Sequence, residues 1–281
     1  MLVIDKIRPM RDWVKKVKGR ELLGFVPTMG YLHQGHLALV RRAKRECERV
    51  VVSIFVNPLQ FGPGEDFDRY PRDPERDISY LEREKVDVVF IPPVEEMYPP
   101  QCSTWLEVGG ALASTLEGTY RPGHFRGVCT VVGKLFNIID PDRAYFGEKD
   151  YQQALIIKKL VKDMNFDLEV ILVPTVREKD GLAASSRNTY LTKEGRKKAL
   201  SLYRGLRLAE ERIKEGERNP REIEKFLGDW LKEQGVEVDY AEVRDLELKE
   251  IDQIKEKVII LVAGKVEGVR LIDNLIVSLG R

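Results

Sequence analysis

Two of the chain's three histidines lie close together in the segment His33-Gln34-Gly35-His36. The segment follows the apolar run 22–26 and the turn Pro27-Thr28-Met29-Gly30, and it opens a stretch of helical periodicity at Leu37. A helix start presents unpaired N–H groups and the positive end of the helix dipole, so it attracts phosphate. Imidazoles beside it can donate hydrogen bonds to phosphate oxygens, and a glycine allows phosphates to approach the backbone. The segment therefore predicts a nucleotide site, with ATP as the expected ligand.

Histidines at this spacing are also compatible with a metal pair, or with two exposed residues that have no function. A zinc site needs further ligands at short spacing. The third histidine, His124, and the cysteines Cys47, Cys102 and Cys129 are far apart in the sequence. The pattern favours a phosphate ligand and leaves zinc as the weaker alternative.

Two neutral amides, Asn57 and Gln60, follow a second apolar run in the segment Phe55-Val56-Asn57-Pro58-Leu59-Gln60-Phe61. An amide can orient a hydroxyl or carboxylate without the strong charge pairing that weakens a nucleophile. These residues therefore suit a substrate whose carboxylate must attack. The alternative interpretation makes Asn57 a turn residue and Gln60 an exposed side chain.

Three further segments are rich in hydrogen-bond donors. In the segment 146–153, Lys149 is expected to reach phosphate, although an exposed lysine followed by a capping Asp150 is the simpler interpretation. The loop 177–188 carries Ser185, Ser186 and Arg187, and it is similar to a mobile phosphate clamp. The basic loop Gly123-His124-Phe125-Arg126-Gly127, after Arg121-Pro122, is either an approach to an anionic substrate or a structural turn.

Short apolar runs alternate with stretches of helical periodicity in the first part of the chain, and this pattern predicts a parallel sheet with right-handed crossovers. Ligands bind beyond the carboxyl ends of the strands in such α/β sheets, and the histidine, Asn57 and Gly147 segments all fall there. The predicted strands are 22–26, 50–56, 86–91, 143–146 and 168–173, and the predicted helices are 37–47, 74–84, 128–139 and 151–164.

The sequence changes character after about Val176, where a polar loop precedes two charged amphipathic stretches. We therefore predict two domains, residues 1–176 and a smaller α+β unit at 177–281. The second is expected to contain helices at 193–216 and 220–234, strands at 236–243, 258–266 and 269–277, and turns at Ala263-Gly264 and Glu267-Gly268.

The composition excludes several classes of partner. The chain has 281 residues with 47 Lys plus Arg against 46 Asp plus Glu, so no overall charge favours nucleic acid or an anionic membrane. Three scattered cysteines fit a reducing compartment, and we expect a cytoplasmic location. The charged N-terminal region is unlike a signal peptide, and no apolar run approaches the roughly 20 residues that span a bilayer.

Taken together, the motifs resemble those of the pantoate–beta-alanine ligase family, also called pantothenate synthetases. The resemblance runs in order along the chain and is densest between Gly24 and Leu191. It implies a Rossmann-like fold of the nucleotidylyltransferase superfamily, with a C-terminal lid domain and a homodimer. The motifs are Pro27-Thr-Met-Gly30 with His33-x-Gly-His36, Phe55-Val-Asn-Pro-x-Gln60, Tyr70-Pro-Arg72, Phe146-Gly-x-Lys149-Asp150-x-x-Gln153 and Asp180-Gly-Leu-Ala-x-Ser185-Ser-Arg-Asn188.

The activity that the resemblance implies is ATP-dependent condensation of (R)-pantoate with beta-alanine. The products are pantothenate, AMP and pyrophosphate, with Mg2+ as cofactor and a pantoyl adenylate as intermediate. Three alternatives remain: a transferase that leaves the nucleotidyl group on its product, an RNA-binding relative of aminoacyl-tRNA synthetases, and a non-catalytic nucleotide sensor. The balanced charge argues against the RNA-binding alternative.

The resemblance also implies a role for each motif residue. His36 is the expected general acid, with His33, Lys149 and Arg187 as further catalytic residues. Gln60 and Gln153 are expected to bind pantoate, Gln60 also faces beta-alanine, and Asn57 supports them. Asp77 is a candidate metal contact. The expected ATP site comprises Met29, Gly30, Tyr31, Leu32, His33, Gln34, Gly35, His36, Gly147, Glu148, Lys149, Asp150, Val176, Ala184, Ser185, Ser186 and Arg187.

Overall fold

The computed structural model describes residues 1–279 and divides the chain into two compact units. Unit 1 comprises residues 1–148 and 152–174, and unit 2 comprises residues 149–151 and the chain from Thr175 onward. The domain boundary predicted from the sequence, between residues 176 and 177, lies close to the division at 174/175. The short segment 149–151 is the part of unit 2 that sequence patterns did not separate.

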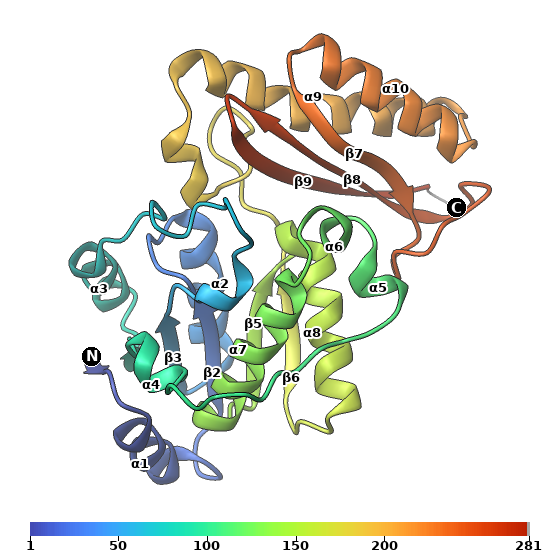
Figure 1. Ribbon diagram of the computed structural model, residues 1–281. Coiled ribbons are helices and arrows are strands. Elements are labelled where there is room, and N and C mark those ends of the chain that lie inside the picture. Colours follow the sequence, from blue (N-terminus) through green and yellow to red (C-terminus); the bar gives the residue numbers. More distant parts are fainter. Residues whose placement is uncertain (280–281) are drawn as a thin grey trace. The chain divides into compact units, whose positions relative to one another are not determined.

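Unit 1 is built on a six-stranded parallel sheet, so the predicted Rossmann-like architecture is confirmed (Figure 1). Its strand order is β1-β4-β3-β2-β5-β6. The apolar runs predict five of the six strands, and they miss β1, which has only three residues and lies at the sheet edge. The strands are β1 (Leu2–Ile4), β2 (Leu23–Thr28), β3 (Arg49–Ile54), β4 (Val88–Phe90), β5 (Arg143–Gly147) and β6 (Glu169–Val173).

Both faces of this sheet are covered by helices, which explains why its strands are apolar along their whole length. Successive residues point to opposite faces: Val51 packs with α1, α7 and α8, whereas Val50 and Val52 pack with α2 and α3. The first group comprises α1 (Ile7–Val17), α7 (His124–Ile139) and α8 (Tyr151–Asp163), and the second comprises α2 (Gln34–Glu46) and α3 (Pro74–Arg83). Shorter elements are η1 (Pro58–Gln60), α4 (Val94–Met97), α5 (Ala111–Ser114), α6 (Glu117–Tyr120) and η2 (Glu148–Asp150).

The chain reverses its direction across the sheet between β2 and β5, which are parallel neighbours. The register pairs Gly24 with Arg143 and Phe25 with Ala144, and β2 ends at Thr28 while β5 ends at Gly147. The crevice at such a reversal, outside the carboxyl ends of the strands, is where α/β sheets bind their ligands. The fold thus brings the residues that follow β2 and β5 to one edge.

Unit 2 is an antiparallel sheet with strand order β7-β8-β9, on which α9 and α10 pack. The Glu267-Gly268 turn joins β8 to β9 as predicted. The prediction of a turn at Ala263-Gly264 is wrong, because both residues lie inside β8. The glycine is explained by close packing, since a Cβ at Gly264 would stand 2.6 Å from Val236 Cγ1. The elements are η3 (Ser186–Tyr190), α9 (Lys193–Glu215), α10 (Pro220–Glu233), β7 (Glu237–Arg244), β8 (Lys257–Val266) and β9 (Val269–Ser278).

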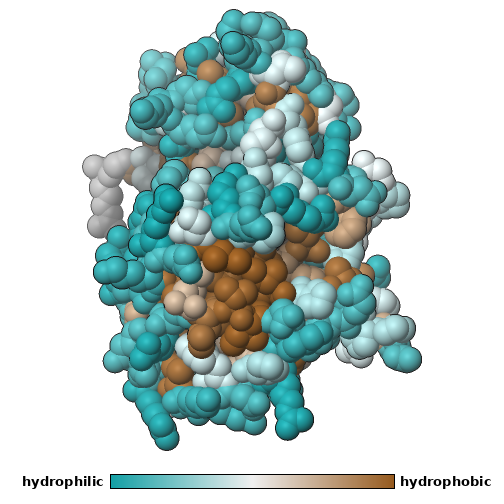
Figure 2. Space-filling model, turned by 90° about the vertical axis from the view of Figure 1, so that its left-hand side faces the viewer, coloured by the Kyte–Doolittle hydropathy of each residue, from teal (hydrophilic) through white to brown (hydrophobic). Residues whose placement is uncertain are grey.

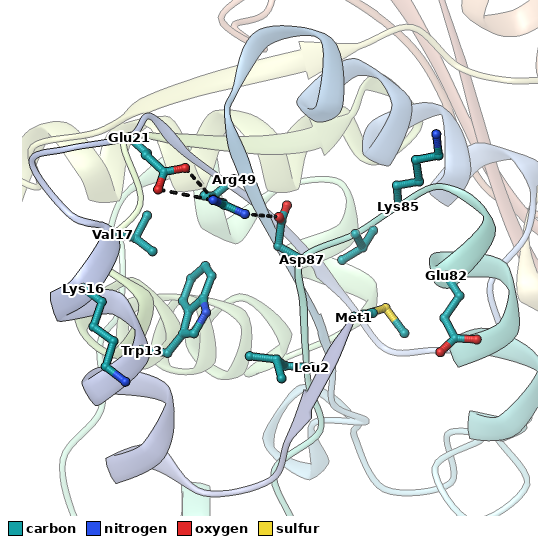
Figure 3. Close-up of a pocket in the computed structure, with 11 residues that line it drawn as sticks. Met1, Leu2, Trp13, Lys16, Val17, Glu21, Arg49, Glu82, Lys85 and Asp87 are labelled. Atoms are coloured by element: carbon teal, nitrogen blue, oxygen red, sulfur yellow. Dashed lines mark hydrogen bonds and ion pairs between the residues drawn. The ribbon is translucent and has the colours of Figure 1, made fainter.

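A hollow of about 740 Å3 lies at the amino ends of strands β1, β3 and β4, on the edge of the unit 1 sheet opposite to the carboxyl ends of its strands (Figure 3). Its wall combines the apolar side chains of Leu2 and Trp13 with an ion-pair group in which Arg49 contacts Glu21 and Asp87. Figure 2 views the side of unit 1 on which the N-terminus lies in Figure 1, and hydrophobic surface gathers there. The exposed side chains of β1 belong to that side, with Leu2 and Val3 each about half exposed.

Candidate active site

The turn after β2 has a backbone that few residues can adopt. Gly30 has φ +81°, and a Cβ there would stand 2.8 Å from Ile54 Cγ2 and 3.1 Å from Asp77 Oδ2. Tyr31 also has positive φ, at 48°. The Thr28 hydroxyl accepts the N–H of Gly30 at 3.1 Å and donates to the carbonyl of Ser53 at 2.7 Å. The turn therefore needs a glycine and is fixed against the neighbouring strand.

Asp77 of α3 fastens the next two residues of this turn. Its carboxylate, 1% exposed, accepts the N–H of Tyr31 at 2.6 Å through Oδ2 and the N–H of Leu32 at 2.7 Å through Oδ1. Burial raises the pKa of Asp77, and the two backbone bonds partly oppose that shift. The adjacent Arg76 donates to the carbonyl of Leu32 at 3.0 Å and stacks on the ring of Tyr31. Asp77 thus supports the backbone of the turn, and its predicted metal contact stays a prediction.

The two histidines cap the start of α2 reciprocally. Nδ1 of His33 accepts the N–H of Gly35 at 3.1 Å, and Nδ1 of His36 accepts the N–H of His33 at 3.3 Å. Their rings lie with centroids 4.0 Å apart. Because each Nδ1 is an acceptor, a neutral ring carries its proton on Nε2, and both Nε2–H groups are donors beside the helix start. Within residues 1–279 no three His, Cys, Asp or Glu side chains are grouped as a metal site would require.

Asn57 is a supporting residue whose amide is fully engaged inside unit 1. Its Nδ2 donates to Oε1 of Gln60 at 3.1 Å and to the carbonyl of Gly127 at 3.0 Å. Its Oδ1 accepts the N–H of Leu59 at 3.2 Å and the hydroxyl of Tyr98 at 2.9 Å. These four bonds use both donors and both lone pairs of the amide. The residue therefore orients the η1 turn, and it does so with a partner, Tyr98, that no sequence motif indicated.

Gln60 connects the η1 turn to the turn after β2. Its Nε2 lies 2.9 Å from Sδ of Met29, and its side chain is largely buried. A primary amide has two N–H groups, and the contact with Met29 uses one of them. Gln153, partly exposed in the first turn of α8, follows the carboxyl end of β5. Its neighbour Gln152 is structural, since it bonds the backbone of Leu112, Thr115 and Glu117.

The residues after β5 are divided between the two units. Gly147 and Glu148 belong to unit 1, whereas Lys149 and Asp150 belong to unit 2. The Lys149 carbonyl accepts a hydrogen bond from Nδ2 of Asn274 at 2.8 Å, and its Nζ lies 3.7 Å from Oδ1 of Asp150. Tyr151 donates its hydroxyl to the carbonyl of Leu246 at 3.0 Å. These contacts explain why this short segment groups with the C-terminal residues.

The predicted phosphate-clamp loop of unit 2 is a folded hairpin. The N–H of Ala184 donates to the carbonyl of Val176 at 3.0 Å, and Arg177 pairs with Ala183 in an antiparallel bridge. The Ser185 hydroxyl accepts the N–H of Arg187 at 3.3 Å and caps η3, in which Ser186 is buried. The loop therefore presents Ser185, Ser186 and Arg187 from a fixed backbone.

Arg177 anchors this hairpin to β9. Its guanidinium makes two bonds to the carboxylate of Asp273, at 2.6 and 2.9 Å, and it stacks on the ring of Tyr203. Asp273 is 4% exposed, so this pair is shielded from water. Sequence reasoning missed the pair, because its partners are separated by 96 residues and neither belongs to a motif.

The family profile described as pantoate-beta-alanine ligase matches residues 2–276 of the chain. The chain belongs to this family. Pantothenate synthetases of Thermotoga neapolitana and Carboxydothermus hydrogenoformans are 54% and 53% identical to it over 281 residues, a span that covers 99% of this chain and 100% and 99% of theirs. The resemblance inferred from the motifs is thus confirmed.

Solved structures of pantoate-beta-alanine ligases have the same fold. Pantothenate synthetase from Thermus thermophilus matches with TM-score 0.93 and 49% identity, covering 98% of this chain and 99% of that one. The ligase from Francisella tularensis, complexed with beta-gamma ATP and beta-alanine, matches with TM-score 0.84 and 36% identity, covering 98% and 97%. None of the helices in residues 1–279 has the length and apolar character needed to cross a bilayer.

Proposed function

We propose that this chain condenses (R)-pantoate with beta-alanine at the expense of ATP, through a pantoyl adenylate, and yields pantothenate, AMP and pyrophosphate. The observation that carries the proposal is one linked group at the sheet reversal. Two imidazole Nε2 donors stand at the start of α2, and the Gln60 amide contacts Met29 of the same turn. The proposed phosphate donors and the proposed carboxylate-orienting amide thus lie on two adjoining turns, after β2 and after β3, in a member of the ligase family.

In the first step the carboxylate of pantoate attacks the α-phosphorus of ATP, and the bond to pyrophosphate breaks in line with it. Gln60 and Gln153 hold pantoate, with Asn57 fixing the amide of Gln60. His33 and His36 donate to the phosphates beside the N–H groups of α2, where negative charge develops on the leaving pyrophosphate. In this proposal His36 also serves as the general acid.

The residues that we propose for ATP binding are 29–36, Gly147, Glu148, Lys149, Asp150, Val176 and 184–187. Lys149 and Arg187 neutralise the phosphates, and Val176 contacts adenine through its main chain. Lys149 and Arg187 are cationic donors suited to that task.

In the second step the amine of beta-alanine attacks the acyl carbon of the adenylate, the amide bond forms, and AMP leaves. An acyl adenylate is hydrolysed readily by water, so we propose that unit 2 acts as a lid during the reaction.

Mg2+ is proposed as a companion of ATP. This ion keeps several waters and binds through substrate phosphates and one or two carboxylates, and it neutralises phosphate charge. Asp77 fits poorly as its ligand, because the carboxylate is buried and both its oxygens accept backbone N–H groups. We therefore assign no step to a protein-bound ion.

Pyrophosphate exchange into ATP tests this function. We expect exchange of labelled pyrophosphate to require pantoate, and release of AMP to begin only when beta-alanine is added. A control without pantoate measures ATP hydrolysis alone. Exchange that depends instead on a phosphorylated acceptor would contradict the proposal and favour a transferase that keeps the nucleotidyl group on its product.

We further propose a homodimer that works in the cytoplasm. The edge strand β1 supports association, because it has an unpaired edge within the sheet and exposes Leu2 and Val3. The free cysteines Cys47, Cys102 and Cys129 fit a reducing compartment. Sedimentation equilibrium of the wild type and of Val3→Lys tests the dimer: we expect a dimer that the lysine weakens.

A further inference from the structure

The basic loop before α7 lies against the main chain of Gln60, a contact that the proposed reaction does not yet use. His124 is the first residue of α7 and is 8% exposed. Its Nδ1 lies 2.9 Å from the carbonyl oxygen of Gln60, and its Nε2 lies 3.1 Å from Nη1 of Arg121. The third histidine of the chain therefore contacts a proposed substrate-binding residue through the backbone.

The partners of His124 determine where its proton is. A carbonyl oxygen accepts hydrogen bonds, so Nδ1 carries the proton and donates it to Gln60. A guanidinium donates, so Nε2 is the acceptor for Arg121. The ring is thus neutral and is oriented from both sides, which makes His124 a rigid support for the carbonyl of Gln60.

Arg121 adds a second bond to the same carbonyl. Its Nη2 donates to the Gln60 oxygen at 3.3 Å, and its Nε and Nη2 donate to the carboxylate of Glu65 at 2.7 and 2.8 Å. Burial alone would raise the pKa of Glu65, but the two bonds from Arg121 outweigh it and lower that pKa. Arg121 therefore connects the loop after Gln60 to the start of α7.

A glycine one turn further along α7 also packs against the backbone of η1. A Cβ at Gly127 would lie 2.1 Å from the carbonyl oxygen of Leu59 and 2.6 Å from the backbone nitrogen of Gln60. The carbonyl of Gly127 also accepts Nδ2 of Asn57 at 3.0 Å. The helix can approach η1 this closely because residue 127 has no side chain.

We propose that His124 and Arg121 are positioning residues for Gln60: by bonding its carbonyl from the start of α7, they aim its amide at pantoate. The inference rests on the proposed pantoate-binding role of Gln60. It gives the basic loop a purpose other than direct contact with an anionic substrate.

A matched pair of amide variants tests the inference. In His124→Asn the side-chain amide reaches the position of Nδ1 and can still donate to Gln60. In His124→Gln it reaches the position of Nε2 and loses that bond. We expect His124→Gln to raise the KM for pantoate about tenfold, the factor that corresponds to one hydrogen bond, and to leave the KM for ATP within about twofold. We expect His124→Asn to keep the pantoate KM within about threefold. If His124→Gln does not fold, Arg121→Lys is the second variant. It keeps the positive charge but lacks the guanidinium that bonds Gln60 and Glu65 together, and we again expect a higher KM for pantoate with a KM for ATP close to wild type.

Two further variants separate the possible failures. Cys129→Ala removes a fully buried side chain of the same helix that packs with Val108 and Ile156, and we expect it to leave both KM values unchanged.

Gln60→Ala tests the role on which the inference rests, and we expect a higher KM for pantoate. If Gln60→Ala raises that KM and His124→Gln does not, the positioning role is overturned while the proposed function stands. If Gln60→Ala has no effect, the proposed role of Gln60 falls and the inference falls with it. Equal increases for both substrates, or the same increase in Cys129→Ala, overturn the inference in favour of a general loosening of α7.

Discussion

The two ends of the parallel sheet in unit 1 both carry buried or half-buried polar groups, but these groups are used differently. At the amino end Arg49 forms ion pairs with Glu21 and Asp87 beside a hollow of about 740 Å3, and Asp87 also accepts the backbone N–H of Val50 and a bond from Lys44. At the carboxyl end Asp77, Asn57 and the histidines bond backbone groups and leave their donors organised around a glycine turn. The difference is one of chemical type: opposite charges pair with one another beside the hollow, whereas amides, imidazoles and one buried carboxylate fix the turn after β2 and the start of α2.

The comparison depends most strongly on His36. We expect His36→Ala to lower the rate of pantoate-dependent pyrophosphate exchange by about 100- to 1000-fold, as loss of one donor to developing charge does in other enzymes. His36→Gln places an amide N–H near the position of Nε2 and is the matched control, with a smaller loss expected. Circular dichroism checks that both variants fold. Turnover close to wild type in His36→Ala would show that the carboxyl-end histidines do not act on phosphate.

The neutral state of His124 gives the carboxyl end a pH dependence. Burial, followed by the adjacent Arg121 cation, lowers the pKa of His124 to about 4, while the bond to the Gln60 carbonyl and the charges of Glu117 and Glu65 oppose this shift. An unfolded histidine titrates near 6.5, so the unfolded chain takes up its proton first as the pH falls from about 6.5 towards 4. The free energy of unfolding should decrease over that window by up to about 3 kcal/mol, and this contribution is fully present above it.

Urea unfolding at pH 7 and at pH 5 measures this dependence. His124→Asn has no group that titrates in the window, so we expect its stability to change less between the two pH values than that of the wild type. Equal changes in both proteins would mean that the ring at position 124 is not kept neutral by folding.

Asp77→Asn tests whether the carboxylate that supports the turn after β2 also supports the proposed binding of ATP. The amide keeps one acceptor and turns an NH2 group towards the N–H of Tyr31 or Leu32, so one buried bond is lost. We expect a loss of about 1–3 kcal/mol in the free energy of unfolding and a rise of about tenfold in the KM for ATP. Thermal unfolding and initial rates measure the two effects. A normal KM for ATP in a destabilised protein would separate the turn from nucleotide binding.

Sequence patterns predicted the sheet well because its strands are buried on both faces and read as continuous apolar runs. They missed β1, whose three residues lie exposed or half-exposed at the sheet edge, whereas the equally short β4 is fully buried and belongs to a longer apolar run. The motif residues, such as His33 and Gln60, were singled out by their types, their spacing and the resemblance to the ligase family, and their roles in binding and catalysis stay predictions.

The contacts by which Asp77 and His124 support the backbone could not be predicted in this way. Asp77 contacts Tyr31 across 46 residues, and His124 contacts Gln60 across 64. Their partners are backbone groups, which every residue possesses, so nothing in the residue types indicates the pairing. Gly127 is similar: its reason is the nearby backbone of Leu59, which becomes visible only in three dimensions.

The smallest effect is expected at the amino end. Arg49→Met removes both ion pairs beside the hollow. We expect kcat/KM for pantoate and ATP to stay within about twofold of wild type, because these half-exposed pairs lie at the opposite end of the sheet from the proposed site and contribute little to stability. Glu21, then Asp87, raise the pKa of Arg49, so the guanidinium is charged at every practical pH and the pairs do not titrate from its side. The thermal midpoint should fall slightly, and less at high salt, because salt already screens these charges in the wild type. A large loss of activity would contradict the comparison, because it would show that the ion pairs beside the hollow contribute to catalysis.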